Sequence, residues 1–493
     1  MSGLLIAGTT SDAGKSLVTA GVCRWLARRG VRVAPFKAQN MSNNSMVCAD
    51  GAEIGRAQWV QARAARVEPE AAMNPVLLKP GSDRRSHVVA LGQPFGTLEA
   101  GEYATGRAGL AEIAFGAFQD LNERYDVVVC EGAGSPAEIN LRGGDYVNMG
   151  LARRFGLPVL VVGDIDRGGV LAAMFGTLAL LSADDQALVA GWVVNKFRGD
   201  VGLLRPGLDS LEKVTGRPVL GVLPWLDRVW IDSEDALAAA GWRREAHGRG
   251  LRVAVVRFPR ASNATDVDAL AAEPGVTVTL TADPDTVADA DVVVLPGSRA
   301  TVTDLAWLRE RGLDTAVAAR VAAGRPVLGI CGGYQMLAES IVDDVESGAG
   351  EVPGLGLLPA RVTFAEEKVL ARPKGEWRGT PVEAYEIHHG SVTTEAPLES
   401  FLDGSRHGAV WGTMWHGAFE NDAFRRAWLT EAAAQSGVEW TPAPDAPGFA
   451  DLREQMLDKL ADAIDEHLDT AALRTLLELG TPKDLPLVPP GAP

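Results

Sequence analysis

The chain has 493 residues, of which 46% are hydrophobic and 23% charged, a globular composition with enough apolar material for two or three domains. Its formal net charge of −17 argues against nucleic acid or an anionic membrane surface as the main partner. The four cysteines have no metal or disulfide spacing, and no run approaches the roughly 18 apolar residues that span a bilayer. We therefore expect a soluble, cytoplasmic protein with free thiols, whose oligomeric state the composition leaves open.

Short apolar runs alternate with helical stretches in residues 1–230, a pattern typical of a parallel sheet covered by helices. The runs are apolar throughout, which indicates strands that are buried on both faces. We predict helices that begin at Lys15 and near Leu151 and Val170, and strands at Leu4–Ala7, Val31–Phe36, Val127–Cys130, Val159–Val162, Ala190–Val194 and Val219–Val222. Residues 1–236 are therefore assigned to a first α/β domain.

A glycine-rich segment, G-T-T-S-D-A-G-K-S at 8–16, lies between the first predicted strand and the first predicted helix. In such a loop, backbone N–H groups hold phosphate oxygens, Lys15 reaches the β and γ phosphates, and Ser16 can bind Mg²⁺. A chance glycine turn is the alternative, but the order strand, loop, helix favours a nucleotide site. We expect ATP and Mg²⁺ as cofactors and assign to nucleotide binding Gly8, Thr9, Asp12, Ala13, Gly14, Lys15, Ser16 and Asn195.

An acidic group is expected to complete the Mg²⁺ site that Ser16 begins. Glu131 is the main candidate because it ends a predicted strand and meets a glycine turn, whereas Asp50, in a polar loop, is a weaker candidate. Asp164 and Asp166 also follow a predicted strand, at the sheet edge where ligands of open parallel sheets bind. Either could bind metal or substrate, or cap the helix that follows.

Small and charged residues at 237–250 predict a linker, after which a second α/β domain covers 251–445. Its predicted strands lie at Leu251–Arg257, Val276–Thr281, Asp291–Leu295 and Pro326–Ile330, and a more antiparallel pattern begins past Gly354. Residues 446–481 form a predicted C-terminal helical segment, with apolar residues at helical spacing between Leu452 and Leu468. The Pro-rich residues 482–493 are predicted to be a flexible tail.

Cys331 is the candidate nucleophile of the second domain. It follows the predicted strand at 326–330 and precedes two glycines, which is the pattern of a nucleophile elbow. Its thiolate could attack the carboxamide of glutamine, which gives a glutamyl thioester and ammonia. The N–H of Gly332 and one near Gly297 would form the oxyanion hole. A small buried core cysteine is the alternative, which the neighbouring glycines disfavour.

His416 is the preferred partner of Cys331, because it lies in the same domain after a strand-like segment. His388 and His389 are rival bases, and only one of two successive strand residues would face inward. The sequence therefore favours a Cys331–His416 pair and keeps the two rivals open.

Several segments of the first domain resemble known families. The loop at 8–16 and the turn E-G-A-G at 131–134 are similar to the dethiobiotin synthetase branch of P-loop enzymes, which phosphorylate a carboxylate. Within that branch, P-F-K-A-Q-N-M-S-N-N-S at 35–45 resembles cobyric acid synthases, as do the runs at 53–58, 73–80, 135–141, 164–169 and 195–200. The sibling a,c-diamide synthases typically have a K-V-G-P-D-Y-type segment where this chain has K-A-Q-N at 37–40. The resemblance covers residues 1–470.

The second domain resembles the class I (triad) glutamine amidotransferases, through L-P-G-S-R-A-T at 295–301, G-I-C-G-G-Y-Q at 329–335 and the His416-Gly417 pair. That class, which is flavodoxin-like in fold, often has His-Pro-Glu, whereas this chain has His-Gly-Ala at 416–418. The acid that orients the histidine is therefore absent from its usual position. Cobyric acid synthases are similar in this, so the resemblance implies a Cys331–His416 dyad, with Glu420 as a poorly placed third member.

The resemblance implies an amide ligase of cobalamin biosynthesis. Such an enzyme uses ATP and glutamine to amidate carboxylates b, d, e and g of adenosylcobyrinic acid a,c-diamide, through a carboxyl phosphate, to adenosylcobyric acid. Its partners would be the corrinoid, glutamine and ATP, with candidate corrinoid contacts at Lys37, Gln39, Asn40, Asp164 and Asp166. Two alternatives stay open: an a,c-diamide synthase or another ATP-dependent amidotransferase, and a P-loop regulatory ATPase with an inactive amidotransferase-like domain.

Overall fold

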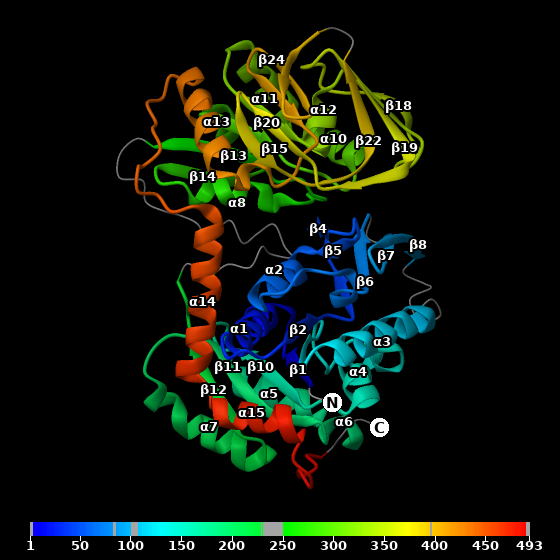
Figure 1. Cartoon of the computed structure of the whole chain (residues 1–493), viewed down its shortest axis with the longest axis vertical. Helices are drawn as coiled ribbons and strands as arrows, with labels where there is room; N and C mark the ends of the chain where they lie inside the picture. Colours follow the sequence, from blue (N-terminus) through cyan, green and yellow to red (C-terminus); the bar gives the residue numbers. More distant parts are fainter. Residues whose placement is uncertain are drawn as a thin grey trace.

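The computed structural model describes residues 3–81, 85–99, 107–227, 229, 250–394 and 397–489. Two α/β regions, here called the N-terminal and C-terminal domains, are stacked along the long axis of the molecule (Figure 1). The long helix α14 (Phe449–His467) runs along one side, from the C-terminal domain at the top to the N-terminal domain below. The predicted linker at 237–250 lies outside the described residues, apart from Gly250.

Six parallel strands form the sheet of the N-terminal domain, in the order β12-β11-β10-β1-β9-β2. The six strands predicted in residues 1–230 are all present, which confirms the predicted parallel α/β class. Their bounds are β1 Gly3–Gly8, β2 Val33–Phe36, β9 Val127–Glu131, β10 Val159–Asp164, β11 Val189–Phe197 and β12 Val219–Pro224.

Side chains of β1 alternate between two hydrophobic cores, because successive strand residues point to opposite faces of a sheet. Leu4 and Ile6 belong to one core, and Leu5 and Ala7 to the other. The first core is covered by α14 and by α1 (Lys15–Ala27), α2 (Arg56–Ala64) and α15 (Thr470–Leu479). The second is covered by α3 (Arg107–Arg124), α4 (Met149–Phe155), α5 (Val170–Ala179) and α7 (Val201–Thr215), with the short α6 at Ala183–Gln186.

A layer of short strands separates the N-terminal sheet from the C-terminal domain (Figure 1). One sheet has the order β3-β6-β7-β8, and β4 pairs with β5 in an antiparallel hairpin. The bounds are β3 Gln39–Met41, β4 Ser45–Val47, β5 Glu53–Gly55, β6 Val76–Pro80, β7 Arg85–Ala90 and β8 Gln93–Glu99. The hairpin β4–β5 is therefore placed to contact the C-terminal domain.

The C-terminal domain is built on a seven-stranded sheet of order β14-β13-β15-β16-β25-β24-β23, parallel from β14 to β25 and antiparallel beyond. The strands are β13 Leu251–Val256, β14 Val276–Thr281, β15 Val292–Leu295, β16 Val327–Ile330, β23 Glu399–Phe401, β24 Gly404–His407 and β25 Val410–Thr413. The helices are α8 Asp268–Ala272, α9 Pro284–Asp289, α10 Thr301–Glu310, α11 Leu313–Ala322, α12 Gly332–Leu337 and α13 Asp422–Gln435. The α/β class predicted for this half is confirmed.

A second sheet of the C-terminal domain has the order β18-β17-β19-β22, and a separate hairpin joins β20 to β21. The long antiparallel pair β19–β22 confirms the pattern predicted past Gly354. The bounds are β17 Ser340–Asp343, β18 Gly350–Pro353, β19 Ala360–Ala371, β20 Lys374–Trp377, β21 Thr380–Glu383 and β22 Glu386–Thr394.

Helix α14 returns from the C-terminal domain and packs against α1, the helix that follows the glycine-rich loop. Its apolar face joins the core beneath α1, and burial of that face supplies most of the stabilisation, since exposed ion pairs contribute little. Arg24 of α1, and Arg28 and Arg29 just after it, also pair with four acids of α14: Arg24 with Glu454 and Asp458, Arg28 with Asp462, and Arg29 with Asp465.

The C-terminal residues correct one expectation. Residues 482–489 of the predicted flexible tail are held against the N-terminal domain, where Val488 is buried. The side-chain amide of Gln186 donates to the carbonyl of Val488 (3.0 Å) and accepts from its N–H (2.9 Å). A guanidinium N–H of Arg217 donates to the carbonyl of Pro486. Buried hydrogen bonds therefore order a segment whose composition suggested fraying, and residues 490–493 lie outside the described part.

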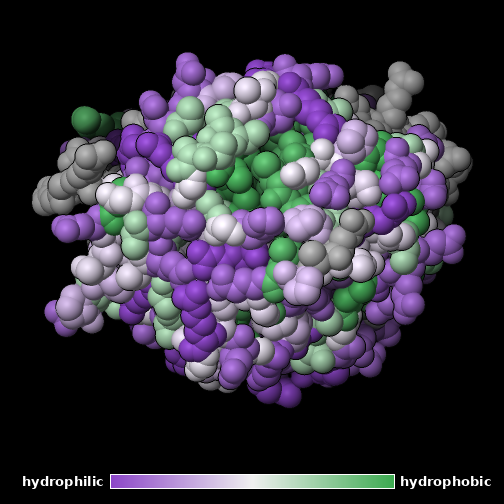
Figure 2. Space-filling model, turned by 90° about the horizontal axis from the view of Figure 1, so that it is seen from above, coloured by the Kyte–Doolittle hydropathy of each residue, from purple (hydrophilic) through white to green (hydrophobic). Residues whose placement is uncertain are grey.

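Seen from the end of the C-terminal domain, hydrophilic residues cover most of the surface, and hydrophobic residues gather in a hollow near the centre (Figure 2). Within the described ranges, no helix combines the length and apolarity that a membrane crossing requires. All four cysteines are free, as predicted, and the structure buries all four.

Candidate active site

The loop after β1 brings the predicted phosphate-binding segment at 8–16 next to the turn that follows Glu131. Gly14 has a φ of 95°, a left-handed conformation that glycine adopts without strain, and α1 begins at the next residue. The ammonium group of Lys15 donates to the carbonyls of Thr10, Ser11 and Gly134, at 2.9, 3.0 and 3.1 Å. Because Gly134 belongs to the turn after β9, Lys15 links the glycine-rich loop to that turn.

Glu131, at the end of β9, is the centre of a buried polar cluster. Its carboxylate accepts from the hydroxyl of Ser16 (2.8 Å), the ammonium of Lys37 (2.9 Å) and the amide of Gln61. Burial raises the pKa of Glu131, but the charge of Lys37 and the hydrogen bonds from Gln61, Lys37 and Ser16 outweigh it, so the pKa is lowered and the carboxylate is ionised. The sequence did not point to Gln61, which reaches Glu131 from α2.

The ends of β10 and β11 support the glycine-rich loop from the other side. Asn195 donates to the carbonyl of Ala13 (2.9 Å). Lys196 donates to the carbonyl of Asp12 and to the carboxylate of Asp164, both at 2.7 Å. The structure therefore joins Asp164 to the loop through Lys196. Asp166 forms an ion pair with Arg198 at 3.2 Å, in a more exposed position.

Ser16 and Glu131 supply the kind of ligand that Mg²⁺ prefers, namely a hydroxyl and a carboxylate oxygen. Across the described residues, no group of three or more His, Cys, Asp or Glu side chains is arranged to hold a metal, so the remaining ligands would come from water and nucleotide phosphates. The predicted ligands of Mg²⁺ also included Asp50, and that assignment needs correction. Asp50 lies exposed in the turn between β4 and β5, where its carboxylate accepts from the N–H of Ala52 (3.0 Å).

Two predicted corrinoid contacts are buried and engaged within the protein. Gln39 accepts a hydrogen bond from the hydroxyl of Tyr146 (2.5 Å), and Asn40 donates to the amide oxygen of Gln58 (3.0 Å). Lys37, the third residue of this segment, is the partner of Glu131. The segment 37–40 is therefore a rigid part of the wall beside the Ser16–Glu131 cluster.

Cys331 lies in a strained turn at the end of β16. Its φ and ψ are 49° and −109°, values that a non-glycine residue rarely adopts. A Cβ atom at Gly333 would lie 1.9 Å from the carbonyl oxygen of Leu295, and one at Gly332 would lie 2.7 Å from the backbone nitrogen of Ser298. Glycines are therefore required after Cys331, and the local geometry is that of a nucleophile elbow.

His416 follows β25 and is fully buried, with its Nδ1 atom 2.6 Å from a carboxylate oxygen of Asp266. The other oxygen of Asp266 accepts from the N–H of Gly417 (2.7 Å). The ring of Tyr385 stacks on the imidazole, with centroids 5.4 Å apart. Asp266 therefore fixes the orientation of the ring and leaves Nε2 without a hydrogen-bond partner on other described side chains.

The electrostatics couple His416 to both neighbours. Burial lowers the pKa of His416, but the carboxylate of Asp266 and the negative charge of a Cys331 thiolate outweigh it, and the pKa of His416 is raised to about 10. At neutral pH the raised pKa keeps the imidazole of His416 protonated, so it can give a proton to a departing group.

The predicted dyad is therefore wrong in one respect, because Asp266 is a third member. It lies in the short 3-10 helix η6 (Ala264–Val267), after β13. In a parallel sheet, the loops after β13, β16 and β25 meet at the same edge. An acidic residue in the loop after β13 was therefore the signal in the sequence that could have pointed to Asp266. Glu420, the suggested third member, instead pairs with Arg56 of α2 and Arg453 of α14.

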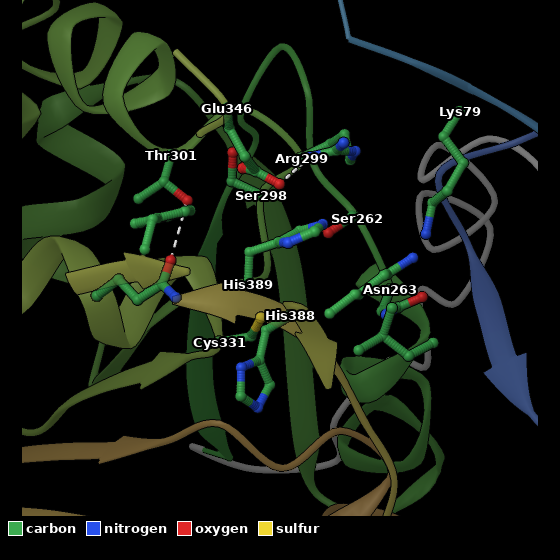
Figure 3. Close-up of a pocket in the computed structure, with 14 residues that line it drawn as sticks. Lys79, Ser262, Asn263, Ser298, Arg299, Thr301, Cys331, Glu346, His388 and His389 are labelled. Atoms are coloured by element: carbon green, nitrogen blue, oxygen red, sulfur yellow. Dashed lines mark hydrogen bonds and ion pairs between the residues drawn. The ribbon is translucent and has the colours of Figure 1, made fainter. Parts of the chain in front are cut away.

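A pocket opens beside Cys331 at the boundary between the two domains (Figure 3). It encloses 430 Å³, including the part that is open to solvent, and Lys79 of the N-terminal domain forms one wall. His388 lies next to Cys331, and neither of its ring nitrogens has a hydrogen-bond partner among the described residues. His389 also lines the pocket, with Nδ1 3.1 Å from the carbonyl of Ala365. Of the three candidate bases, His416 is the one whose ring is held by a hydrogen-bonded carboxylate, that of Asp266. The carboxylate that faces His388, that of Glu386, lies 3.8 Å from its Nε2.

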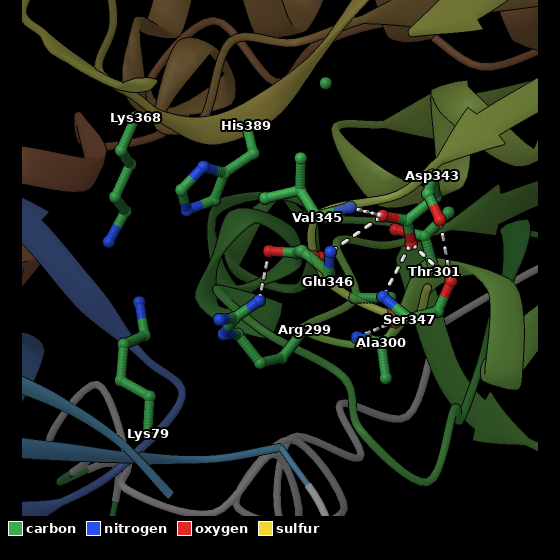
Figure 4. A network of polar contacts seen from close by, with 12 residues as sticks. Lys79, Arg299, Ala300, Thr301, Asp343, Val345, Glu346, Ser347, Lys368 and His389 are labelled. Atoms are coloured by element: carbon green, nitrogen blue, oxygen red, sulfur yellow. Dashed lines mark hydrogen bonds and ion pairs between the residues drawn. The ribbon is translucent and has the colours of Figure 1, made fainter. Parts of the chain in front are cut away.

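One side of the pocket is a polar network of loops (Figure 4). Arg299 pairs with Glu346, and Asp343 holds the Glu346 loop by accepting from the N–H groups of Glu346 and Ser347, at 2.8 and 3.0 Å. An ion-paired cation and anion are thus held in the lining of the pocket.

The predicted oxyanion residues lie on adjoining turns. The carbonyl of Gly297 accepts from the N–H of Ser262 (2.8 Å), and a Cβ atom at Gly297 would lie 3.0 Å from Cε1 of His416. Ser298, the next residue, packs on Gly332. The turn at 296–298 therefore adjoins both His416 and the elbow.

Two family models match the chain. The first, described as a CobQ/CobB/MinD/ParA nucleotide binding domain, matches residues 4–237. The second, described as a CobB/CobQ-like glutamine amidotransferase domain, matches residues 252–424. The two matches correspond to the parts of the chain that hold the Lys15–Glu131 and Cys331–His416 sites.

Curated relatives match along the whole chain. A cobyric acid synthase of Mycolicibacterium gilvum is 61% identical over 499 residues, and the match covers 100% of both chains. The cobyric acid synthase of Mycobacterium tuberculosis is 61% identical over 502 residues, again with 100% of both chains. That of Cutibacterium acnes is 61% identical over 475 residues, which cover 95% of this chain and 98% of that protein.

Proposed function

Since the chain belongs to the cobyric acid synthase family, whose members are ATP-dependent, glutamine-hydrolysing ligases, we propose that it amidates carboxylates b, d, e and g of adenosylcobyrinic acid a,c-diamide to give adenosylcobyric acid. The match at 61% identity along the full length favours this activity over an a,c-diamide synthase or a P-loop regulatory ATPase. The observation that carries the proposal is the presence of both a Ser16–Glu131 nucleotide site and a Cys331–His416–Asp266 site on one chain.

The Cys331 site produces ammonia. The thiolate of Cys331 attacks the carboxamide carbon of glutamine, while N–H groups near Gly297 and Gly332 stabilise the negative charge that develops on the oxygen. His416 gives its proton to the departing nitrogen, so ammonia leaves and a glutamyl thioester remains. A water molecule, deprotonated by His416, then releases glutamate.

The nucleotide site activates the acceptor. Transfer of the γ-phosphoryl group of ATP to a corrinoid carboxylate gives a carboxyl phosphate, and attack by ammonia forms the amide and releases phosphate. Lys15 stabilises the charge of the phosphates, and N–H groups of the loop at 8–16 orient them. Mg²⁺, held by Ser16 and Glu131, would neutralise phosphate charge there. Asn195 and Asp164 position the loop, and Lys37, Gln39, Asn40 and Asp166 remain the proposed corrinoid contacts.

The proposal extends to the location of the protein. Four free, buried thiols suit the reducing cytoplasm, where we place this enzyme.

The test is an assay of the purified protein with ATP, Mg²⁺, glutamine and adenosylcobyrinic acid a,c-diamide. We expect ADP and glutamate to appear in proportion to the amides formed. Cobyrinic acid, which lacks the a and c amides, serves as the competing acceptor. A preference for cobyrinic acid would indicate an a,c-diamide synthase, and ATP turnover that ignores both acceptors and glutamine would indicate a regulatory ATPase.

Replacing Asp266 by asparagine is expected to lower the turnover number for glutamine hydrolysis by about 10²-fold, because the imidazole loses its fixed orientation. The same change removes the carboxylate that raises the pKa of His416, so that pKa should fall. An NMR titration of the His416 imidazole measures this fall. Asp291→Asn, at a buried aspartate that pairs with Arg252 in the same domain, is the control. An unchanged NMR titration of His416 would contradict the role of Asp266.

A further inference from the structure

The hairpin β4–β5 of the N-terminal domain reaches the loop that carries Asp266. The backbone N–H of Ser45 donates to the amide oxygen of Asn263 (2.8 Å), and the amide oxygen of Asn44 accepts from the N–H of Ala264 (3.3 Å). All of these groups are buried. The two contacts form a reciprocal pair, in which each asparagine side chain accepts from the backbone of the other segment.

This pair acts at the start of η6, the helix that holds Asp266. Asn263 has a left-handed backbone, with φ 49° and ψ 36°, and none of its own side-chain atoms caps the helix. The first N–H groups of a helix have no partner inside the helix and need one from elsewhere. Asn44 supplies that partner for Ala264, so a residue of one domain caps the helix that carries a triad member of the other.

The same hairpin supports His416 through Tyr385. Val47 forms a small hydrophobic cluster with Tyr385 and Ile387. Tyr385 stacks on the imidazole and exchanges two backbone hydrogen bonds with His416, each 2.9 Å long. Residues 44–47 therefore touch the immediate supports of both Asp266 and His416.

A buried ion cluster fixes the hairpin between the domains. Glu53 of β5 accepts from Ser45 (2.6 Å), pairs with Lys79 of β6 and pairs with Lys368 of the C-terminal domain. Figure 4 shows Lys79 and Lys368 facing each other across the boundary. Removal of one partner from a buried charge cluster is costly, so this cluster holds the hairpin in one position.

We propose that Asn44, Ser45 and Val47 form a positioning element of the glutaminase, through which the synthetase domain holds Asp266 and His416 in their reactive arrangement. This inference rests on the proposed function. Residues 37–40, the proposed corrinoid contacts, lie shortly before the element in the chain.

The test compares Asn44→Ala and Asn263→Gly with the unaltered full-length enzyme. Glycine adopts the backbone angles of Asn263 without strain, so that variant removes the acceptor for Ser45, together with one side chain of the pocket lining, and leaves the backbone relaxed. We expect the turnover number for glutamine hydrolysis to fall about 10-fold in each variant, because the catalytic groups are displaced slightly. The KM for glutamine should stay the same in Asn44→Ala, since Asn44 is not among the residues that line the pocket, whereas Asn263 is. Amidation with added ammonium should also be unchanged.

Two further measurements separate positioning from loss of folding. The pKa of His416, followed by NMR titration of its imidazole, should fall in both variants as Asp266 is displaced, which a change confined to the corrinoid site would not cause. Arg372→Ala removes another contact across the domain boundary, an exposed ion pair with Glu68 at 3.7 Å, and should change none of these quantities.

The remaining outcomes are decisive. Glutamine hydrolysis at the unaltered rate in both variants overturns the inference. An equal loss of amidation rate with glutamine and with ammonium also overturns the inference, because the defect then lies in the fold or the acceptor site. If the unaltered enzyme itself hydrolyses no glutamine, the proposed function is wrong, and the inference about the positioning element is overturned with it.

Discussion

Replacing Cys331 by alanine is expected to abolish glutamine-dependent amidation while amidation with added ammonium continues. Without the thiolate, no glutamyl thioester forms, and loss of a nucleophile lowers turnover by about 10⁴-fold or more. The nucleotide site lies in the other domain and retains Lys15, Ser16 and Glu131. Ammonia supplied from solution should therefore still attack the activated carboxylate. The measurement is amide formation with each nitrogen source, together with glutamate release.

Cys23→Ala is the matched control. Burial in the core raises the pKa of the Cys23 thiol, which keeps it protonated and unreactive. We expect this variant to use both nitrogen sources at the normal rate. Glutamate release by the Cys331→Ala protein would show that another residue is the nucleophile.

Replacing Lys15 by alanine is expected to impair amidation and spare glutamine hydrolysis, the opposite of the Cys331→Ala change. Amidation should fall by about 10²- to 10³-fold with either nitrogen source, because a charge that stabilises the transferring phosphoryl group is lost. Basal glutamine hydrolysis at Cys331 should continue. ADP release and amide formation should fall in parallel, while glutamate release with glutamine alone stays near its original rate.

Lys213, an exposed lysine near the end of α7, provides the control for the Lys15 change. Its replacement by alanine removes the same charge from the same domain, away from the glycine-rich loop. If Lys15→Ala retained normal amidation with ammonium, the loop at 8–16 would not be the site of phosphoryl transfer.

The succession of neighbouring residues and elements along the chain made the two sites recognisable in the sequence. The loop at 8–16 lies between an apolar strand and a helix, and Cys331 lies between a strand and two glycines. Both patterns depend on neighbouring residues, because the backbone of a few residues builds a phosphate-binding loop or a nucleophile elbow. The parallel strands were recognisable for a similar reason, since strands buried on both faces must be apolar throughout.

The partners of these residues could not be found in this way. Asp266 is 150 residues from His416 in the chain, and Gln61 is 70 residues from Glu131. Their contacts depend on the order of strands in a sheet and on which helix covers which face. Burial and packing of whole elements decide both, and the spacing of residues along the chain does not record them.

The packing of the two domains against each other determined the partners of Glu420, Asn44 and Asn263. Glu420 is close to His416 in sequence, which made it a candidate third member, yet its carboxylate turns to Arg56 and Arg453 at the domain boundary. Asn44 and Asn263 belong to different domains and meet because contacts such as the Glu53 ion cluster hold those domains together. The sequence by itself therefore determined the two chemistries and the residues that begin them. The tertiary structure alone decided which acid orients His416 and how the synthetase domain supports the glutaminase, because those contacts follow from long-range burial and charge pairing.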